Sequence, residues 1–394
     1  MTLYVFGSSL TSAYWNGAAT YYRGIYKSLH ALGYDITFAE PDIYDRIHHR
    51  DWPLDQDPPY ARAPLYRNRA ELDLHLRRAQ TADLIIKHSG VGADDDYLEA
   101  AVLDAAAAAP AGARPRVAFW DVDAPATLAA IEATPEHPLR RLIPQYDFVF
   151  TYGGGPPVVD RYRRLGAKRC CPIYNGLDPE THFPVPPRPD WTADLTFLGH
   201  RLPDREARVR HYFLGAAERC PGKNFLLAGE GWTADAAAWP ANVRLAGYVA
   251  PADHNALNSS ARFVLNLNRD SMVQTGFSPP TRIFEAAGAG AAVITDAWPG
   301  IALFFEPGRE ILVAPTPASL AEYLDDVSPE AATRLGARAR ERALAEHTYA
   351  RRAQRVHCLL HAPDAVSLAP ERPQPGVRAS RRGLGLTPVS ELAA

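Results

Sequence analysis

Residues 276–290 read GFSPPTRIFEAAGAG, and the apolar stretch AAVIT follows at 291–295. A turn rich in Gly, Ser and Pro leads into a short helix, and small residues connect that helix to a strand. The unpaired N–H groups and the positive dipole end at the start of such a helix suit phosphate or sugar hydroxyls. Glu285 on the helix can accept two hydrogen bonds from a diol such as ribose. An ordinary αβ connection closed by glycine is an equally good interpretation of this stretch alone.

Strands and helices alternate on both sides of this stretch. Apolar runs in the first half predict strands at 3–7, 35–40, 83–88, 116–120, 147–152 and 168–174. Apolar runs in the second half predict strands at 194–199, 224–231, 243–249, 262–268, 293–295 and 310–314. Strands separated by helices in this rhythm are typical of parallel, doubly wound sheets. The fold class that we expect is therefore α/β, with two Rossmann-like domains that face each other across a cleft.

The Pro-rich segment PVPPRPD, residues 184–190, separates the two series and predicts a stiff linker. We expect a first domain over residues 1–183 and a second over residues 191–345. We also expect residues 346–362 to form a helix that crosses back to the first domain. Residues 363–394 lack apolar periodicity and predict a disordered tail.

Composition excludes several classes of protein. The 394 residues are 47% hydrophobic and 22% charged with a net charge of −3, which predicts a globular protein without a general basic surface for nucleic acid. The four cysteines form no CxxC pair and no Cys/His cluster with zinc spacing, so we expect reduced thiols. No signal-peptide pattern and no apolar run of transmembrane length is present. A soluble, cytoplasmic location without a membrane span is therefore expected.

Polar clusters follow several predicted strands of the second half. Arg201 and Arg205 come just after the strand at 194–199, where either could hold a diphosphate or simply be a solvated surface arginine. Tyr248 ends the run VRLAGYV, where a nucleobase could stack on its ring or the ring could cover the domain core. In open α/β sheets ligands bind outside the carboxyl ends of the strands, so these clusters could face one cleft.

Two further clusters follow strands of the first half. His88 ends the strand at 83–88 and could act as a general base, contact a sugar or be structural. Asp121 and Asp123, in the run WDVD, could cap the following helix, supply a base for an acceptor hydroxyl or bind a divalent metal. Two carboxylates alone do not complete a metal shell, so the metal is the weakest of these three interpretations.

Together these segments resemble glycosyltransferases of the two-Rossmann (GT-B) type, of the group 1 class, and within it the CgeB-like spore-maturation family. The resemblance rests on TFLGHRLPDREAR, VRLAGYV and GFSPPTRIFEAAGAGAAVITD followed by FEPGREILVA, and it is weaker in FWDVDAP and CCPIYNGLDPETHFP. It implies that the first domain binds an acceptor and that the second binds a nucleotide-diphosphate sugar, which we expect to be UDP-linked.

The resemblance also implies roles for single residues. Glu285 would bind the ribose hydroxyls, and Arg201 with Arg205 would hold the diphosphate. Tyr248 would flank the base, and His88 would be catalytic or contact a sugar. Backbone groups of Gly276, Phe277 and Ser278 would face the donor, and Arg282 would add a charge or support the helix.

One departure concerns the mechanism. Retaining enzymes of this class commonly carry two glutamates separated by seven residues, and the position of the first is occupied here by Phe277. Stereochemistry therefore stays open, and an inverting route with Asp121, Asp123 or His88 as base is one alternative.

The expected function is transfer of a sugar from the nucleotide to an acceptor hydroxyl. We expect no cofactor and no metal, because arginines and helix N–H groups can stabilise the leaving phosphate. A sugar-nucleotide epimerase and a non-catalytic nucleotide-sugar-binding module are the alternatives. The acceptor could be a small metabolite, a glycan, a protein or modified nucleic acid, the last being the least expected partner.

Overall fold

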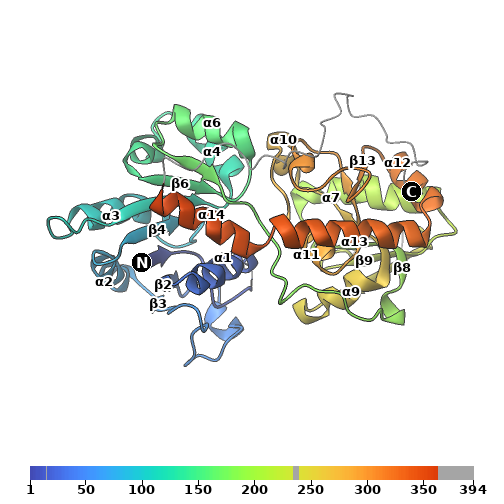
Figure 1. The fold of residues 1–394 in the computed structure, drawn as a ribbon, viewed down its shortest axis with the longest axis horizontal. Helices are drawn as coiled ribbons and strands as arrows, with labels where there is room; N and C mark the ends of the chain where they lie inside the picture. The colour runs from blue at the N-terminus through green and yellow to red at the C-terminus, as the bar shows by residue number, and fades with distance from the viewer. Residues whose placement is uncertain (15, 234–238, 363–394) are drawn as a thin grey trace. The chain divides into compact units, whose positions relative to one another are not determined.

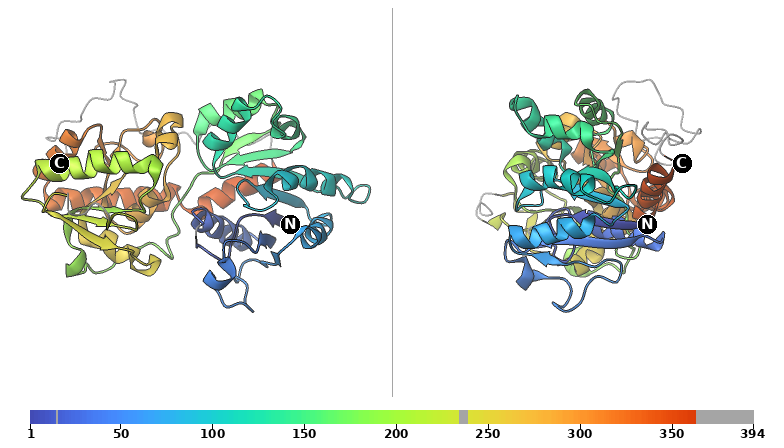
Figure 2. Two further views of the ribbon diagram at one scale, coloured as in Figure 1. Left: turned by 180° about the vertical axis from the view of Figure 1, so that it is seen from behind. Right: turned by 90° about the vertical axis from the view of Figure 1, so that its left-hand side faces the viewer.

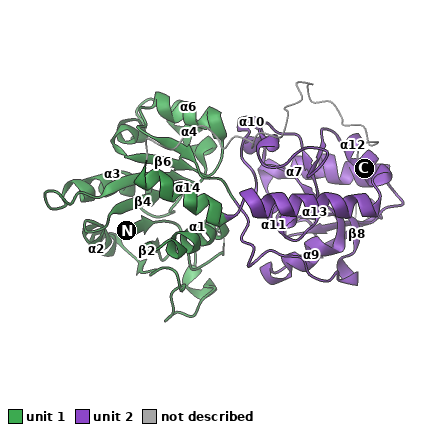
Figure 3. Ribbon diagram, in the orientation of Figure 1, with its two compact units in different colours: residues 1–175, 349–370 green, residues 176–348, 371–394 purple. Residues whose placement is uncertain are grey.

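Each half of the chain builds a parallel β-sheet covered by helices (Figure 1). The computed structural model describes residues 1–14, 16–233 and 239–362. These divide into a first unit, residues 1–175 with the helix α14 (Tyr349–His361), and a second unit, residues 176–348 (Figure 3). The predicted tail, residues 363–394, lies outside the described residues.

The first unit contains seven parallel strands in the order β3-β2-β1-β4-β5-β6-β7. The order reverses beside β1, so that β1 and β4 are neighbours although β2 and β3 lie between them along the chain. The strands are β1 (Thr2–Phe6), β2 (Asp35–Pro41), β3 (Leu65–Tyr66), β4 (Leu84–His88), β5 (Arg116–Asp121), β6 (Phe148–Thr151) and β7 (Cys170–Pro172). The helices are α1 (Ala19–Ala31), η1 (Arg46–His49), α2 (Arg69–Ala79), α3 (Asp95–Ala107), α4 (Ala124–Ala133), α5 (Leu139–Leu142), η2 (Ile143–Gln145) and α6 (Gly155–Arg164).

Alternate residues of these strands enter two separate cores, because successive side chains of a strand point to opposite faces. In β1, Leu3 and Val5 join one core with residues of α1 and α14. Tyr4 and Phe6 of the same strand join the other core with residues of α2, α3 and α6. Helices therefore cover both faces of the sheet, as the predicted doubly wound fold requires.

The helix α14 packs beside α1 in the first unit, although more than 300 residues separate them (Figure 1). Seen from behind, the red helix lies among the blue and cyan elements of this unit (Figure 2). Gly24 permits the close approach, since a Cβ at this position would lie 2.1 Å from the Tyr349 ring. The guanidinium of Arg352 is buried and donates to the backbone oxygen of Asn175.

The second unit contains six parallel strands in the order β10-β9-β8-β11-β12-β13, which reverses beside β8. The strands are β8 (Ala193–Leu198), β9 (Phe225–Ala228), β10 (Val243–Gly247), β11 (Ala261–Asn266), β12 (Ala292–Asp296) and β13 (Leu312–Ala314). The helices are η3 (Pro189–Trp191), α7 (Pro203–Val209), the π-helical turn η4 (Arg210–Leu214), α8 (Gly215–Arg219), η6 (Pro251–Asp253), α9 (His254–Ser260), α10 (Asp270–Thr275), α11 (Thr281–Gly288), η7 (Ile301–Leu303), α12 (Pro317–Asp326) and α13 (Pro329–Glu346).

The structure differs from the sequence expectations at the predicted linker. Residues 184–190 belong to the second unit, where the N–H of Val185 lies 3.3 Å from Ser259 Oγ and that of Arg188 lies 2.7 Å from Ser260 Oγ. The segment between β2 and α2 contains the edge strand β3. The π-helical turn η4 lies between α7 and α8.

Candidate functional site

Two arginine side chains converge where the strand order of the second unit reverses. The strands β8 and β11 are neighbours there, and β8 leads into Gly199. A Cβ at Gly199 would lie 3.1 Å from Nη2 of Arg205 on α7 and 3.0 Å from Nη2 of Arg282 on α11. Both guanidinium groups also lie over the ring of Phe197, at 5.7 and 5.1 Å from its centroid. The absence of a side chain at position 199 thus leaves room for two cations.

These two cations are poorly neutralised. Neither Arg205 nor Arg282 forms an ion pair with a carboxylate of a described residue. Nη2 of Arg205 donates to the backbone oxygen of His200 at 2.7 Å, and its buried Nε has no partner within the described chain. Nη1 of Arg282 donates to Oδ1 of Asn266 at 3.2 Å.

Burial raises the free energy of both charges. It is the main cause that lowers the pKa of Arg282 to about 9, and the positive charge of Arg205 is the next cause. Burial also lowers the pKa of Arg205. Like charges that are held together without a counter-ion favour an anion, and the planar guanidinium fork matches phosphate oxygens.

The loop before α11 is held in a fixed conformation. Gly276 and Phe277 have φ values of 70° and 49°, in the left-handed region. The N–H of Phe277 donates to the backbone oxygen of Pro299 at 2.7 Å, and its ring packs on Gly300, where a Cβ would lie 2.3 Å away. The buried hydroxyl of Ser278 donates to the backbone oxygen of Gly276 at 3.0 Å.

Ser278 and Phe277 therefore shape this loop with their side chains, and the N–H of Phe277 is already occupied by the backbone oxygen of Pro299. The helix α11 begins directly after the loop, and the N–H groups of its first turn have no partner within the helix. These groups lie in the same turn as Arg282, so they can add donors to an anion that the two arginines bind.

Glu285 lies one turn beyond Arg282 on α11, in a group with two histidines. Its Oε1 is 3.8 Å from Nε2 of His182, and ligand atoms of Glu285, His182 and His254 all lie within 4.8 Å of one another. The side chains of Glu285 and His182 are 18% and 11% exposed, so solvent reaches both. Burial is the main cause that lowers the pKa of His254, against the opposing effect of Glu285.

Arg201 is engaged in a different interaction. Its Nε and Nη2 each donate to a carboxylate oxygen of Glu206 at 2.7 Å, and this pairing is the main cause that lowers the pKa of Glu206 to about 2. A phosphate would have to displace this bidentate pair to reach Arg201. The geometry therefore favours Arg205 and Arg282, and not Arg201, for a diphosphate.

Tyr248 follows β10 and is 60% exposed. The alternative interpretation, that its ring covers the domain core, is therefore wrong. The ring is available to a planar ligand from solvent.

The structure contradicts the catalytic hypothesis for His88. Its side chain is 1% exposed, lies among Tyr22, Phe38 and Trp120, and its Nε2 is 2.6 Å from the hydroxyl of Tyr26. Burial lowers the pKa of His88 to about 3. A neutral, buried imidazole in an aromatic core cannot reach an acceptor, so His88 is a structural residue of the first unit.

Asp121 is also buried, and its carboxylate is occupied. It accepts from the hydroxyls of Ser89 at 2.8 Å and Thr127 at 3.0 Å, from the hydroxyl of Tyr162, and from the N–H of Asp123 at 3.0 Å. These contacts occupy the carboxylate of Asp121, and Asp123, the residue before α4, makes no side-chain capping hydrogen bond to that helix. Asp123 is exposed at the first residue before α4 and remains the candidate base of this cluster.

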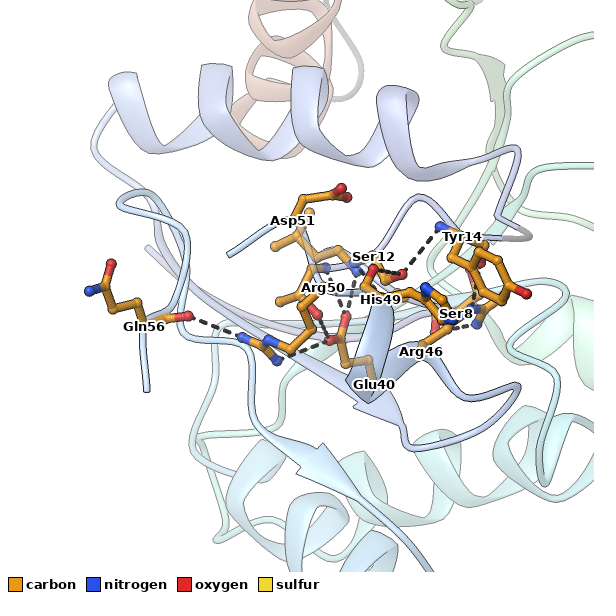
Figure 4. A network of polar contacts seen from close by, with 12 residues as sticks. Ser8, Ser12, Tyr14, Glu40, Arg46, His49, Arg50, Asp51 and Gln56 are labelled. Atoms are coloured by element: carbon orange, nitrogen blue, oxygen red, sulfur yellow. Dashed lines mark hydrogen bonds and ion pairs between the residues drawn. The ribbon is translucent and has the colours of Figure 1, made fainter. Parts of the chain in front are cut away.

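A second polar network holds the loops that follow β1 and β2 (Figure 4). The buried carboxylate of Glu40 accepts from the N–H groups of Leu10 and Thr11 and from the hydroxyl of Thr11. Nη1 of Arg50 lies 4.0 Å from the same carboxylate. The two loops are thereby fixed at the carboxyl ends of their strands, where the rings of Tyr14 and His49 stack at 3.9 Å.

Comparisons with known proteins agree with this architecture. Residues 205–357 match the model of a glycosyl transferase-like family. Sucrose-phosphate synthase from Thermosynechococcus elongatus is similar, with a TM-score of 0.64, 14% identity, and 91% of this chain and 98% of that chain covered. The chain has the GT-B glycosyltransferase fold. No curated protein matches it by sequence.

Two further GT-B structures carry ligands. Anabaena Alr3699/HepE in complex with UDP and glucose has a TM-score of 0.61 and 13% identity, with 91% of this chain and 99% of that chain covered. An α-glucosyltransferase in complex with UDP and a 13-mer DNA has a TM-score of 0.62 and 11% identity, with the same coverage. Within the described residues, none of the helices combines the length and apolar character needed to cross a bilayer.

The sequence interpretation missed several residues of the second unit. Asn266 orients Arg282, and the buried carboxylate of Asp296 pairs with Arg208 and accepts from the N–H of Asn268. The exit of the predicted strand RFVLNLN carried a signal for the two asparagines, since polar residues at a strand exit often face a ligand. His182 and His254 are 72 positions apart and carried no such signal.

Proposed function

We propose that the protein is a glycosyltransferase that binds a nucleotide-diphosphate sugar on its second unit and transfers the sugar to an acceptor hydroxyl. The single observation that carries the proposal is the pair of partly buried cations, Arg205 and Arg282, beside Gly199. They form no ion pair with a described carboxylate and lie at the strand-order reversal of a parallel sheet. That reversal is the usual ligand position of open α/β sheets.

We further propose that the donor is UDP-linked. The two neighbours in the comparisons that hold UDP share the GT-B fold with this chain and support this choice. In this assignment Arg205, Arg282 and the first turn of α11 hold the diphosphate, Glu285 accepts from the ribose hydroxyls, and Tyr248 stacks on the base.

In the transfer step the bond between the anomeric carbon and the diphosphate oxygen breaks, and the acceptor oxygen bonds to that carbon. Negative charge develops on the leaving diphosphate, where Arg205 and Arg282 stabilise it without a divalent cation. The acceptor hydroxyl must lose a proton, and Asp123 is the candidate that accepts it. Position 277 is Phe, so this chain has no glutamate there that could take part in the step.

Two finer assignments accompany this proposal. We place the chain in the CgeB-like spore-maturation family on the sequence motifs of its second half. We place it in the cytoplasm because Cys170 and Cys220 are buried free thiols, which fits a reducing compartment.

The proposal is tested with UDP and UDP-glucose as probes. Titration calorimetry should show one UDP site per chain, and UDP should raise the melting temperature. Release of UDP from UDP-glucose should require an acceptor pool, whereas an epimerase would convert the donor without an acceptor. UDP binding without any consumption of donor would indicate a binding module, and absence of UDP binding would contradict the site itself.

A further inference from the structure

A cluster of two histidines and one carboxylate lies in the second unit beside the proposed phosphate site. The side chains are His182 in the segment before η3, His254 at the start of α9 and Glu285 on α11. Nε2 of His182 is 3.8 Å from Oε1 of Glu285, and the ligand atoms of all three residues lie within 4.8 Å of one another. Imidazole nitrogen and carboxylate oxygen are the donors that Zn²⁺ and related dications accept.

Packing brings these segments together. Gly288 lies one turn after Glu285, and a Cβ there would lie 2.9 Å from the backbone oxygen of His182 and 2.4 Å from Leu177. The chain that carries His182 can therefore lie directly against α11. On its other side Asn255 of α9 donates to the backbone oxygen of Thr181 at 2.8 Å, and its Oδ1 lies 3.3 Å from the N–H of Phe183.

Both imidazoles have outer contacts of the kind that orient metal-binding histidines. Nδ1 of His182, the ring nitrogen opposite the one that faces Glu285, is 2.9 Å from the hydroxyl of Thr181. Nε2 of His254 is 3.3 Å from the backbone oxygen of Val249. Such contacts restrict the ring and its tautomer, and they support ligand positions at metal centres.

We propose that His182, His254 and Glu285 bind Zn²⁺ or a similar late first-row dication. Three protein ligands at bond lengths of about 2.0–2.2 Å place their donor atoms about 3.4 Å apart in a tetrahedral site, so the observed cluster closes by small side-chain rotations. The side chains of His182 and Glu285 are partly exposed, so solvent reaches the cluster. Arg282 donates to Asn266 and lies over the Phe197 ring. Burial mainly lowers the pKa of His254, and the charge of Arg282 also contributes.

The metal is not a cofactor of the proposed transfer, because the carboxylate of Glu285 cannot accept hydrogen bonds from the ribose hydroxyls while it coordinates a cation. We infer that cation and nucleotide exclude each other, so the site makes donor binding sensitive to zinc. This consequence rests on the proposed function, whereas cation binding by the cluster does not.

The cation site is tested on the full chain after treatment with a chelator, with Co²⁺ as a spectroscopic probe for Zn²⁺. The wild type should bind one Co²⁺ per chain with visible d–d absorption that Zn²⁺ removes. His182→Ala and His254→Ala should abolish the absorption, and Glu285→Gln, which keeps the size of the side chain, should weaken binding at least about tenfold. His211→Ala, at an exposed position of η4, is the matched control and should bind like the wild type.

Thermal unfolding of each variant shows that the loss comes from the ligands and not from unfolding. Absence of Co²⁺ absorption in the wild type, or absorption in the two histidine variants equal to that of the wild type, would overturn the proposal.

Mutual exclusion is tested by releasing Co²⁺ with UDP. UDP also chelates Co²⁺ in solution, and this effect is the same for every protein variant. The difference between the wild type and Arg282→Met, which should bind UDP more weakly, therefore reports competition at the site. The wild type should release Co²⁺ at roughly tenfold less UDP than the variant. Equal release would overturn mutual exclusion, and UDP calorimetry on metal-free protein would show separately whether the nucleotide site exists.

Discussion

Replacing Arg282 by Met should stabilise the ligand-free protein and weaken its binding to UDP. Burial is the main cause that lowers the pKa of Arg282 from the ordinary arginine value to about 9, and this corresponds to about 5 kcal/mol of unfavourable free energy for the charged side chain in the fold. The penalty is complete below pH 9 and disappears as the pH rises above about 9 toward the ordinary pKa of arginine, so a measurement at neutral pH contains all of it. Met has similar length and no charge.

The substitution also removes the donor to Oδ1 of Asn266, which is buried. An unsatisfied buried acceptor costs about 1–3 kcal/mol. The net gain in the free energy of unfolding is therefore about 2 kcal/mol. For a unit of this size that gain raises the melting temperature by about 4–8 °C.

The same change removes charge-assisted hydrogen bonds to the diphosphate. Bonds of this kind contribute about 1.5–3 kcal/mol, so the Kd for UDP should rise roughly 10- to 100-fold. Calorimetric titration with UDP measures the Kd, and differential scanning calorimetry of the ligand-free protein measures the melting temperature.

Arg201→Met is the matched control, because it removes an arginine that Glu206 already neutralises. Its melting temperature should not rise, and its UDP affinity should stay within about twofold of the wild type. A less stable Arg282 variant with unchanged UDP affinity would refute the reasoning. A tenfold loss of UDP affinity in the Arg201 variant would indicate that Arg201 binds the diphosphate.

Four other changes have defined outcomes. Tyr248→Ala should weaken UDP binding roughly tenfold without a change in melting temperature, because the ring is 60% exposed; equal affinity in calorimetry would remove it from the base site. Asp123→Asn should lower turnover of UDP-glucose about 100-fold at unchanged UDP affinity, as steady-state kinetics would show if it is the base. Burial raises the pKa of Glu99 from 4.5 to about 7, so between these pH values the folded protein holds a proton that the unfolded chain releases. The free energy of unfolding should therefore fall as the pH rises from 4.5 to 7. Glu99→Gln should flatten this slope in urea titrations. Gly24→Ala should lower the melting temperature, because its Cβ would lie 2.1 Å from the ring of Tyr349, and an unchanged value would mean that α14 moves aside at little cost.

Apolar runs separated by turns were enough to predict the fold class, because burial on both faces of a parallel sheet makes each strand a continuous apolar stretch. The edge strand β3 was missed since it contains only Leu65 and Tyr66 within a segment rich in Pro and Asp. The linker prediction followed prolines at 184–190, whereas the units divide after Asn175. Proline marks a stiff segment, and tertiary contacts with α9 decide to which unit that segment belongs.

The site could be predicted only by region. Arg201 and Arg205 follow the same predicted strand, and the sequence does not distinguish them. In the structure Glu206 forms an ion pair with Arg201, whereas Arg205 donates to the backbone oxygen of His200. His88 ends a strand, as a catalytic histidine can, but whether the ring turns into the core or toward solvent depends on Tyr26 and other neighbours distant in the chain. A local sequence pattern predicts where a residue lies in its helix or strand. It does not predict which other residue neutralises the charge of that side chain.

The order of the strands explains why the decisive pair was hidden. Arg205 and Arg282 are 77 positions apart along the chain, and they meet because β8 and β11 are neighbours while β9 and β10 lie on the far side of β8. Each arginine extends from a helix that starts near the end of one of these strands, and Gly199 removes the side chain that would separate them. A like-charge pair at this position costs stability in the ligand-free protein. Binding of an anion removes that cost, so the same repulsion contributes to affinity for the diphosphate and to the charge stabilisation that transfer requires.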